Sequence, residues 1–301
     1  MTEPPCDTRV AAVTPWYAAH ARDLPWRRPG TSAWGVLVSE FMLQQTPVAR
    51  VLPVWTAWMA RWPSAADLAE EPPGAAVRAW GRLGYPRRAL RLHACAGAVV
   101  ERHDGRVPAT AGELRSLPGV GSYSAAAVAA FAHGQRVVVL DTNVRRVLAR
   151  LVAGTDQPTA ASPARAEHDR ATRLLPSDPV SSALWSVAVM ELGALVCTSR
   201  TPRCAACPVA AQCVWLQRGR PPTAPTARPQ AYAGTDRQCR GRLLAVLRDS
   251  DRPVGSRRLD QAWPDRVQRV RALDSLVADG LVEPLAHDRF ALPGTATDDT
   301  G

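Results

Sequence analysis

The apolar residues of the first two thirds of the chain recur with the period of α-helices. Residues 15 to about 196 are rich in alanine, and their apolar positions repeat with helical spacing. Capping and turn signals interrupt the pattern at four places: Thr31-Ser32, Trp62-Pro63-Ser64, Pro72-Pro73-Gly74 and Pro176-Ser177-Asp178-Pro179. The pattern predicts a mostly α-helical bundle. One run, RVVVL at residues 136–140, is extended but too short to build a sheet, so we expect a connector into a helix that starts near Asp141.

The chain changes character after about residue 217. The stretch RGRPPTAPTARP has no apolar period, which predicts a linker over residues 218–234 between a core of residues 1–217 and a tail of residues 235–301. Apolar positions in the tail predict a helix around residues 243–247, a second over 256–263, a third over 267–277, and a hairpin of 281–282 with 289–292. This order is typical of a winged-helix module.

The third tail helix carries three arginines on the surface left by its apolar stripe, namely Arg266, Arg269 and Arg271. They suit phosphate contacts. A solvated basic helix in a small packing domain explains them equally well, and both interpretations stay open.

Composition points to an acidic partner. The 301 residues are 46% hydrophobic, enough for a substantial core, and 37 Lys and Arg against 27 Asp and Glu give a net charge of +10. Such a balance favours a polyanion such as nucleic acid, although a solvated basic surface has the same composition. Residues 1–10 do not resemble a signal peptide, and no apolar run approaches the ~18 residues of a membrane span, so we expect a cytoplasmic protein.

Four of the seven cysteines crowd into one short segment. Cys197, Cys204, Cys207 and Cys213 follow the spacing C-x6-C-x2-C-x5-C, which indicates a metal or cluster site in a reducing compartment. Cys6, Cys95 and Cys239 are expected to be free thiols. Four thiolates hold zinc or an iron–sulfur cluster, but zinc more often uses two separated C-x-x-C knuckles. The spacing therefore favours one 4Fe-4S cluster in the loop of residues 197–213, and the first gap presents Arg200 and Arg203 for phosphate contact.

A glycine turn precedes a second candidate site. In Leu117-Pro118-Gly119-Val120-Gly121, Gly119 and Gly121 would let backbone N–H groups approach a DNA phosphate at the start of the next helix. Taken alone, the glycine sequence is that of a common helix-to-helix turn. Asp141, twenty residues after Gly121, would likewise be an ordinary helix N-cap if it stood alone.

Hairpin, VVVLD segment and cysteine loop together resemble the helix-hairpin-helix glycosylase and endonuclease III superfamily. The resemblance implies that Asp141 stabilises positive charge at the deoxyribose C1′, positioned by Tyr123 and Asn143. Tyr123 stands where endonuclease III enzymes have a lysine nucleophile. Without that amine the Schiff-base route to strand cleavage is lost, so we expect hydrolysis that leaves an abasic site.

Glu40 lies in a string that narrows the resemblance. Helical spacing puts Val36, Leu37 and Leu43 beside it, an apolar setting that would favour a neutral acid able to donate a proton. A lone glutamate is usually an exposed helix residue. Ser39-Glu40-Phe41-Met42-Leu43-Gln44-Gln45-Thr46, however, is similar to the catalytic helix of the MutY family of adenine DNA glycosylases. There the glutamate is the general acid for adenine N7, and the second glutamine wedges into the DNA stack.

Three further segments resemble the same family, and the match covers residues 15–216: Leu24-Pro25-Trp26-Arg27, Leu83-Gly84-Tyr85 and Met190-Glu191-Leu192-Gly193-Ala194. The resemblance implies that Trp26, Arg27 and Glu191 contact the flipped adenine, and that Gln45 and Tyr85 fill the DNA around oxidised guanine. Pro86 replaces the second aromatic residue of the family's loop.

The tail departs from the family, because it has neither the residues for the Nudix-like domain nor its Phe-Ser-His loop. We expect a monomer that hydrolyses adenine from double-stranded DNA with A:8-oxoguanine or A:G mispairs. A thymine-mismatch or oxidised-pyrimidine glycosylase on the same scaffold is the alternative, and a non-catalytic DNA-binding protein is a third.

Overall fold

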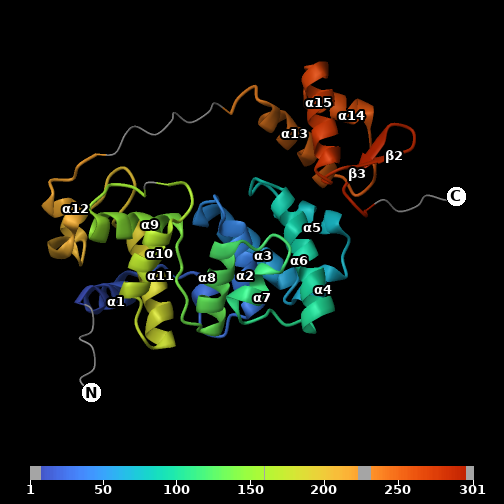
Figure 1. Ribbon diagram of the computed structural model, residues 1–301. Helices are drawn as coiled ribbons and strands as arrows, with labels where there is room; N and C mark the ends of the chain where they lie inside the picture. Colours follow the sequence, from blue (N-terminus) through green and yellow to red (C-terminus); the bar gives the residue numbers. More distant parts are fainter. Residues whose placement is uncertain (1–7, 159, 223–231, 296–301) are drawn as a thin grey trace. The chain divides into compact units, whose positions relative to one another are not determined.

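The computed structural model describes residues 8–158, 160–222 and 232–295 (Figure 1). The chain divides into two compact units, each built from discontinuous segments. The first unit comprises residues 1–36, 109–115 and 121–227, and the second comprises residues 37–108, 116–120 and 228–301. As the apolar period predicts, both units are built mainly from helices.

The first unit consists of α1 (Thr8–His20), α7 (Ala111–Arg115), α8 (Ser122–His133), α9 (Thr142–Leu148), α10 (Arg165–Leu174), α11 (Pro179–Leu195), α12 (Val214–Gln217) and short turns that include η1 (Pro25–Arg27) and η2 (Ala149–Ala153). Its core joins α1, α9, α10 and α11 through buried side chains such as Val13, Val147 and Leu192. Gly134 ends α8 in the left-handed conformation, and Asp141 caps α9, as the sequence predicts. The residues between them form neither helix nor strand, which confirms the connector.

The second unit contains α2 (Ala33–Leu43), α3 (Val48–Arg61), α4 (Ala65–Ala69), α5 (Pro73–Trp80) and α6 (Arg87–His103). Ser64 forms a capping box with Asp67 at the start of α4, so the predicted Trp-Pro-Ser turn becomes a helix N-terminus. Trp58 anchors the interior, because its ring meets Trp62 at 4.7 Å and Trp80 at 5.8 Å, both edge-on.

The tail forms α13 (Asp236–Arg248), α14 (Ser256–Ala262), α15 (Arg266–Ala278) and the strands β1 (Val254–Gly255), β2 (Glu283–Leu285) and β3 (Arg289–Ala291). The three strands make an antiparallel sheet in the order β1-β3-β2, in which Phe290 pairs with Val254 and with Pro284. The prediction of three helices and a hairpin is confirmed. The position of the first hairpin strand is corrected, because β2 begins after residues 281–282. Leu281 and Val282 are buried in the segment just before β2, so their apolar character reflects burial and not strand pairing.

The tail contacts α5 and α6 within the second unit. Gly74 donates its backbone N–H to the carbonyl of Pro293 at 2.7 Å, and a Cβ at this position would lie 2.4 Å from the side chain of Thr295. Arg78 of α5 donates to the carbonyl of Ser250 at 2.8 Å, and Arg87 of α6 pairs with Asp279 at 3.2 Å. Only glycine therefore fits at position 74, and the tail packs directly on the helices.

Candidate functional site

Asp141 is held at the first turn of α9 by two hydrogen bonds. Its Oδ1 accepts from the Val144 N–H at 2.6 Å, and its Oδ2 accepts from Nδ2 of Asn143 at 2.8 Å. Burial raises the pKa of Asp141 above its ordinary value, while these hydrogen bonds and the nearby Arg146 pull the pKa down. The carboxylate is thus desolvated but still supported by donors, which suits it to face a developing cation.

Asn143 is itself fixed by a residue that the sequence did not single out. Arg146 donates from Nη2 to Oδ1 of Asn143 and to the carbonyl of Gly193, both at 2.8 Å. A Cβ on Gly193 would lie 2.7 Å from the Cβ of Asn143, so the glycine permits α11 to pack closely against α9. Gly193 belongs to the predicted Met190–Ala194 wall, and its smallness was the available signal.

Tyr123 lies in the first turn of α8 in the same unit. It is half-buried and packs on the small cluster of Ala127, Ala130 and Val139, which Met190 of α11 also contacts. Tyr123 and Met190 therefore flank one apolar cluster. Whether Tyr123 positions Asp141 stays a prediction.

Glu191 is fully buried in α11 and surrounded by arginines. Arg22 binds it with Nε on Oε1 and Nη2 on Oε2, both at 2.7 Å, and Arg27 adds a 2.9 Å contact to Oε2. Burial alone would raise the pKa of Glu191, but the two arginines lower it to about 2. The sequence identified Glu191, Arg27 and the buried Trp26 but missed Arg22, whose partner lies 169 residues away.

Glu40 lies on α2 with 6% of its surface exposed. Val36 and Leu37 beside it are buried and Leu43 is half-buried, which confirms the apolar setting predicted from helical spacing. Glu40 belongs to the second unit and Asp141 to the first.

Two predicted DNA-contacting side chains, Gln45 and Tyr85, stand in loops of the second unit. Both are exposed, and both adopt positive φ angles, 54° and 46°. Gln45 follows α2, and Tyr85 precedes α6. A left-handed backbone is uncommon at non-glycine residues, and such strain is frequent at functional sites.

The glycine hairpin has one obligatory glycine. Gly119 has a φ of +76°, and a Cβ there would lie 2.8 Å from the Cβ of Arg91 and 3.0 Å from the ring of Phe41. Gly121 caps α8 with extended backbone, and a Cβ there would meet nothing within 4 Å. Gly119 therefore fixes the turn, whereas Gly121 leaves open space at the helix N-terminus.

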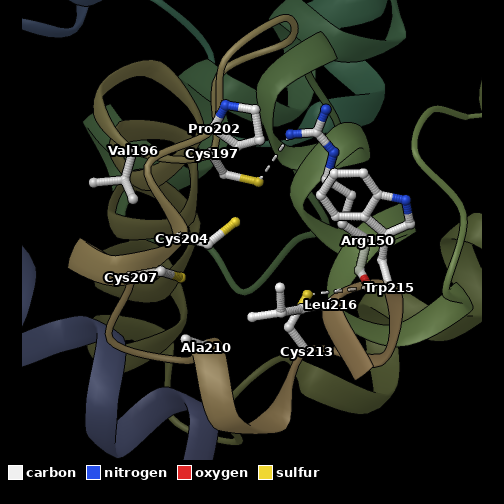
Figure 2. Close-up of a pocket in the computed structure, with 10 residues that line it drawn as sticks. All are labelled: Arg150, Val196, Cys197, Pro202, Cys204, Cys207, Ala210, Cys213, Trp215 and Leu216. Atoms are coloured by element: carbon white, nitrogen blue, oxygen red, sulfur yellow. Dashed lines mark hydrogen bonds between the residues drawn. The ribbon is translucent and has the colours of Figure 1, made fainter. Parts of the chain in front are cut away.

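The four clustered cysteines line one pocket in the first unit, and Figure 2 shows their side chains around a common space. Val196, Pro202, Ala210 and Leu216 make its apolar wall. No group of three His, Cys, Asp or Glu side chains among the described residues could hold a single metal ion. Four thiols around one apolar space are a ligand set that fits an iron–sulfur cluster.

Arg150 completes this pocket and was missed from the sequence. It is 1% exposed, donates from Nη1 to the Thr198 carbonyl at 2.7 Å and lies 3.5 Å from Sγ of Cys197. Its Nη2 pairs with Asp156 at 2.6 Å, and its guanidinium stacks on Trp215 (Figure 2). The loop is therefore tied to η2 by a buried cation.

Two of the remaining cysteines lie outside this site. Cys95 and Cys239 are buried free thiols, as expected, and Cys6 lies outside the described residues.

The arginines proposed for phosphate contact differ in their surroundings. Arg200 is exposed, whereas Arg203 donates to the carbonyl of Leu195 at the end of α11. In α15, Arg269 pairs with Asp260 at 2.7 Å with only 12% of its side chain exposed, and Arg271 pairs with Asp236 at 2.6 Å. Acidic neighbours already hold two of these three cations.

Sequence comparison places this chain among known proteins. It is 54% identical to the adenine DNA glycosylase of Mycolicibacterium smegmatis over 280 residues, which covers 93% of this chain and 94% of that protein. The chain belongs to the adenine DNA glycosylase family. The Mycobacterium tuberculosis member is also 54% identical, over 290 residues, covering 96% of this chain and 93% of that protein.

More distant members of the family match about two thirds of the chain. The Homo sapiens adenine DNA glycosylase is 42% identical over 211 residues, which is 67% of this chain and 38% of that protein. Residues 38–169 match the family described as HhH-GPD superfamily base excision DNA repair protein. The matched segment contains Glu40, the glycine hairpin and Asp141.

Solved structures give the same fold. A thermostable thymine-DNA glycosylase aligns with a TM-score of 0.63 at 25% identity, covering 69% of this chain and 95% of that chain. An endonuclease III–DNA complex aligns with a TM-score of 0.59 at 20% identity, covering 70% and 95%, which shows the shared fold. Within the described residues, no helix is both long and apolar enough to cross a membrane.

Proposed function

We propose that this protein is a monofunctional adenine DNA glycosylase, and that it removes adenine opposite 8-oxoguanine or guanine in double-stranded DNA. The observation that carries the proposal is Asp141, a desolvated carboxylate that Asn143 and Val144 hold by hydrogen bonds. Tyr123 occupies the position of the lyase nucleophile, so the site lacks the amine that strand cleavage needs.

The reaction divides between two carboxyl groups. Adenine must first leave the helix, which costs a few kcal/mol of unstacking and unpairing. Glu40 then protonates N7, the bond between N9 and C1′ breaks, and its electron pair leaves with the base. Asp141 stabilises the oxocarbenium-like sugar until water adds to C1′ and loses a proton, which leaves an abasic site.

DNA is held by several groups in this proposal. The backbone N–H groups of the Gly119–Gly121 hairpin bind phosphate at the start of α8, where the helix dipole favours an anion. Exposed Arg200 adds a cationic contact, and Arg203 a second one if it exchanges its partner at Leu195 for phosphate. We propose that Trp26 and Arg27 bind the flipped adenine, and that Glu191 acts mainly by holding Arg27 and Arg22.

We also propose one 4Fe-4S cluster on Cys197, Cys204, Cys207 and Cys213. When bound, the cluster supplies a rigid structural anchor, because neither protonation of adenine nor hydrolysis requires an electron. This chain's own residues present Arg200 from the anchored loop. Anaerobically purified protein should contain four irons per chain and absorb broadly near ~400 nm. One equivalent of zinc without iron would overturn the assignment.

A panel of duplexes tests the function. Single-turnover base release is measured on A:8-oxoguanine, A:G, A:T, T:G and an oxidised pyrimidine opposite guanine. We expect release from A:8-oxoguanine and A:G without direct strand scission. Preferred thymine release would favour the thymine-glycosylase alternative, and binding without release would favour a non-catalytic protein.

Variants of the two carboxyl groups test their roles in the same assay. Glu40→Gln and Asp141→Asn should each slow adenine release by about 10²- to 10⁴-fold while duplex binding persists. Near-normal release by either variant would refute its role.

A further inference from the structure

Arg88 is a buried arginine that the proposed chemistry does not use. It stands in the first turn of α6, and 6% of its surface is exposed. Burial lowers the pKa of Arg88 to about 10, so the side chain remains charged at neutral pH. A buried cation is retained at a cost, and its hydrogen-bond partners show what it does there.

The partners of Arg88 lie at the end of α2 and in two separate loops. From Nη1 it donates to the carbonyl of Phe41 at 2.8 Å and also reaches the carbonyl of Gln44, which are among the last carbonyls around the end of α2. From Nη2 it donates to the hydroxyl of Thr46 at 2.9 Å and to the carbonyl of Gly84 at 3.2 Å. The planar guanidinium therefore forks between residues 44–46 and residues 83–85.

Three further contacts close the same junction. The Thr46 hydroxyl lies 3.2 Å from the carbonyl of Leu83, so the loops are also joined directly. The guanidinium lies 5.5 Å from the centre of the Tyr85 ring and 5.2 Å from that of Trp80. All of these groups belong to the second unit.

The residues at the tips of the two loops are the exposed Gln45 and Tyr85. Both are strained at positive φ, and such conformations persist only where the surroundings determine them. Arg88 and Thr46 supply that determination, because they hold the residues on either side of Gln45 and the residue before Tyr85.

We propose that Arg88, together with Thr46, is a positioning device that clamps loop 44–46 to loop 83–85, so that Gln45 and Tyr85 enter the DNA as one rigid wedge. This inference rests on the proposed function, in which these two side chains fill the space around the base opposite adenine. A shared clamp makes the two side chains interdependent, whereas independent loops would let each act alone.

The test is a double-mutant cycle with single-turnover adenine release from A:8-oxoguanine duplex. In the wild-type background, Gln45→Ala and Tyr85→Ala should each slow release, and the double variant should lose far less than the product of the two effects. In the Thr46→Val and Arg88→Lys backgrounds the coupling should fall to within about twofold of simple multiplication. Arg88→Met alone should slow release by up to about 100-fold, the effect of a small misplacement.

Three controls separate positioning from general damage. Arg61→Met removes an exposed cation of the same unit that pairs with Glu71, and it should leave release and coupling unchanged. Circular dichroism and absorbance near ~400 nm report the folded fraction of each variant. Thr46→Val is nearly isosteric, so the test stands even if Arg88 variants fold poorly.

Fluorescence of 2-aminopurine beside the target adenine reports unstacking before bond cleavage, and its rise should shrink in the clamp variants.

The outcomes distinguish the two proposals. If neither Gln45→Ala nor Tyr85→Ala affects release, the wedge assignment in the proposed function fails, and the clamp fails with it. If each matters but their coupling survives in Thr46→Val and Arg88→Lys, or is absent in the wild type, the clamp is refuted and the proposed function stands.

Discussion

Two buried arginines of the first unit and one exposed arginine of the tail differ in the groups that they bind. Arg146 and Arg150 are buried, and most of their hydrogen bonds go to main-chain carbonyls or to residues of the proposed sites. In the tail, Arg271 meets Asp236 at the surface, where both side chains are about half exposed. Burial therefore decides whether an arginine holds the residues of a site in place or only forms an ion pair at the surface.

Desolvation explains the difference. Water cannot replace a lost partner of a buried guanidinium. Removal of either partner therefore leaves an unsatisfied charge or carbonyl, which lowers the stability of the fold by several kcal/mol. An exposed pair exchanges partners with water and contributes about 0–1 kcal/mol. The net charge of +10 counts both kinds equally, so it overstates the cations available to DNA.

The largest expected effect is the loss of Arg150. Arg150→Met leaves Asp156 and the carbonyls of Thr198 and Ser199 without their buried donor, which should cost about 3–5 kcal/mol. The cysteine loop should loosen, and iron content and absorbance near ~400 nm should fall together. Arg200→Met, in the exposed part of the same loop, is the matched control and should keep its iron. Full iron content in Arg150→Met would show that the thiols alone hold the pocket.

The second effect concerns Arg146 and the pH profile. Arg146→Met removes a donor from Asn143 and a nearby positive charge that lowers the pKa of Asp141, so that pKa should rise further. Because the proposed mechanism needs Asp141 ionised, the acid limb of the rate profile should move to higher pH. The lost hydrogen bond should slow release by about 10- to 100-fold, from about 1.5–3 kcal/mol. An unchanged pH profile in single-turnover assays would show that Arg146 does not influence Asp141 during the reaction.

These arginines also mark the limit of what the sequence predicts. Caps and glycines are local signals, so Asp141, Gly134 and the bounds of α8 follow from a few adjacent residues. Arg146 bonds to the carbonyl of Cys197, which lies 51 residues away, and no local pattern distinguishes it among the 37 arginines of the chain.

The tail shows a different limit. Strand β1 has two residues, which is too short to leave an alternating pattern, so the sequence missed it. The apolar pair before β2 was mistaken for a strand, because burial in a turn and burial in a sheet select the same residue types.

The third effect is a dependence of stability on pH through Glu191. The pKa of Glu191 is about 2 in the folded protein against an ordinary value of 4.5, so its contribution to stability is complete well above pH 4.5 and is lost as pH falls toward 2. Between pH 6 and pH 4 this loss is on the order of 1 kcal/mol. Urea unfolding measures the free energy of unfolding, and its decline between pH 6 and pH 4 should be smaller by this amount in Glu191→Gln. Asp23→Asn, which breaks an exposed and water-screened pair with Arg28, should remove much less of the decline than Glu191→Gln.

The smallest effect tests the surface side of the comparison, through the salt dependence of duplex binding. Each phosphate contact contributes about one unit to the slope of log K against log salt. Arg266 has no acidic partner among the hydrogen bonds and ion pairs found in the described tail, so Arg266→Ala should lower the slope by about one if α15 meets DNA. Arg271 is already neutralised by Asp236, so Arg271→Ala should change the slope little. Asp236→Asn should free Arg271 and raise the slope, because the released cation gains a phosphate. Equal losses for both arginine variants would show that the surface pair does not compete with DNA, whereas no change in any of the three variants would place α15 away from the duplex.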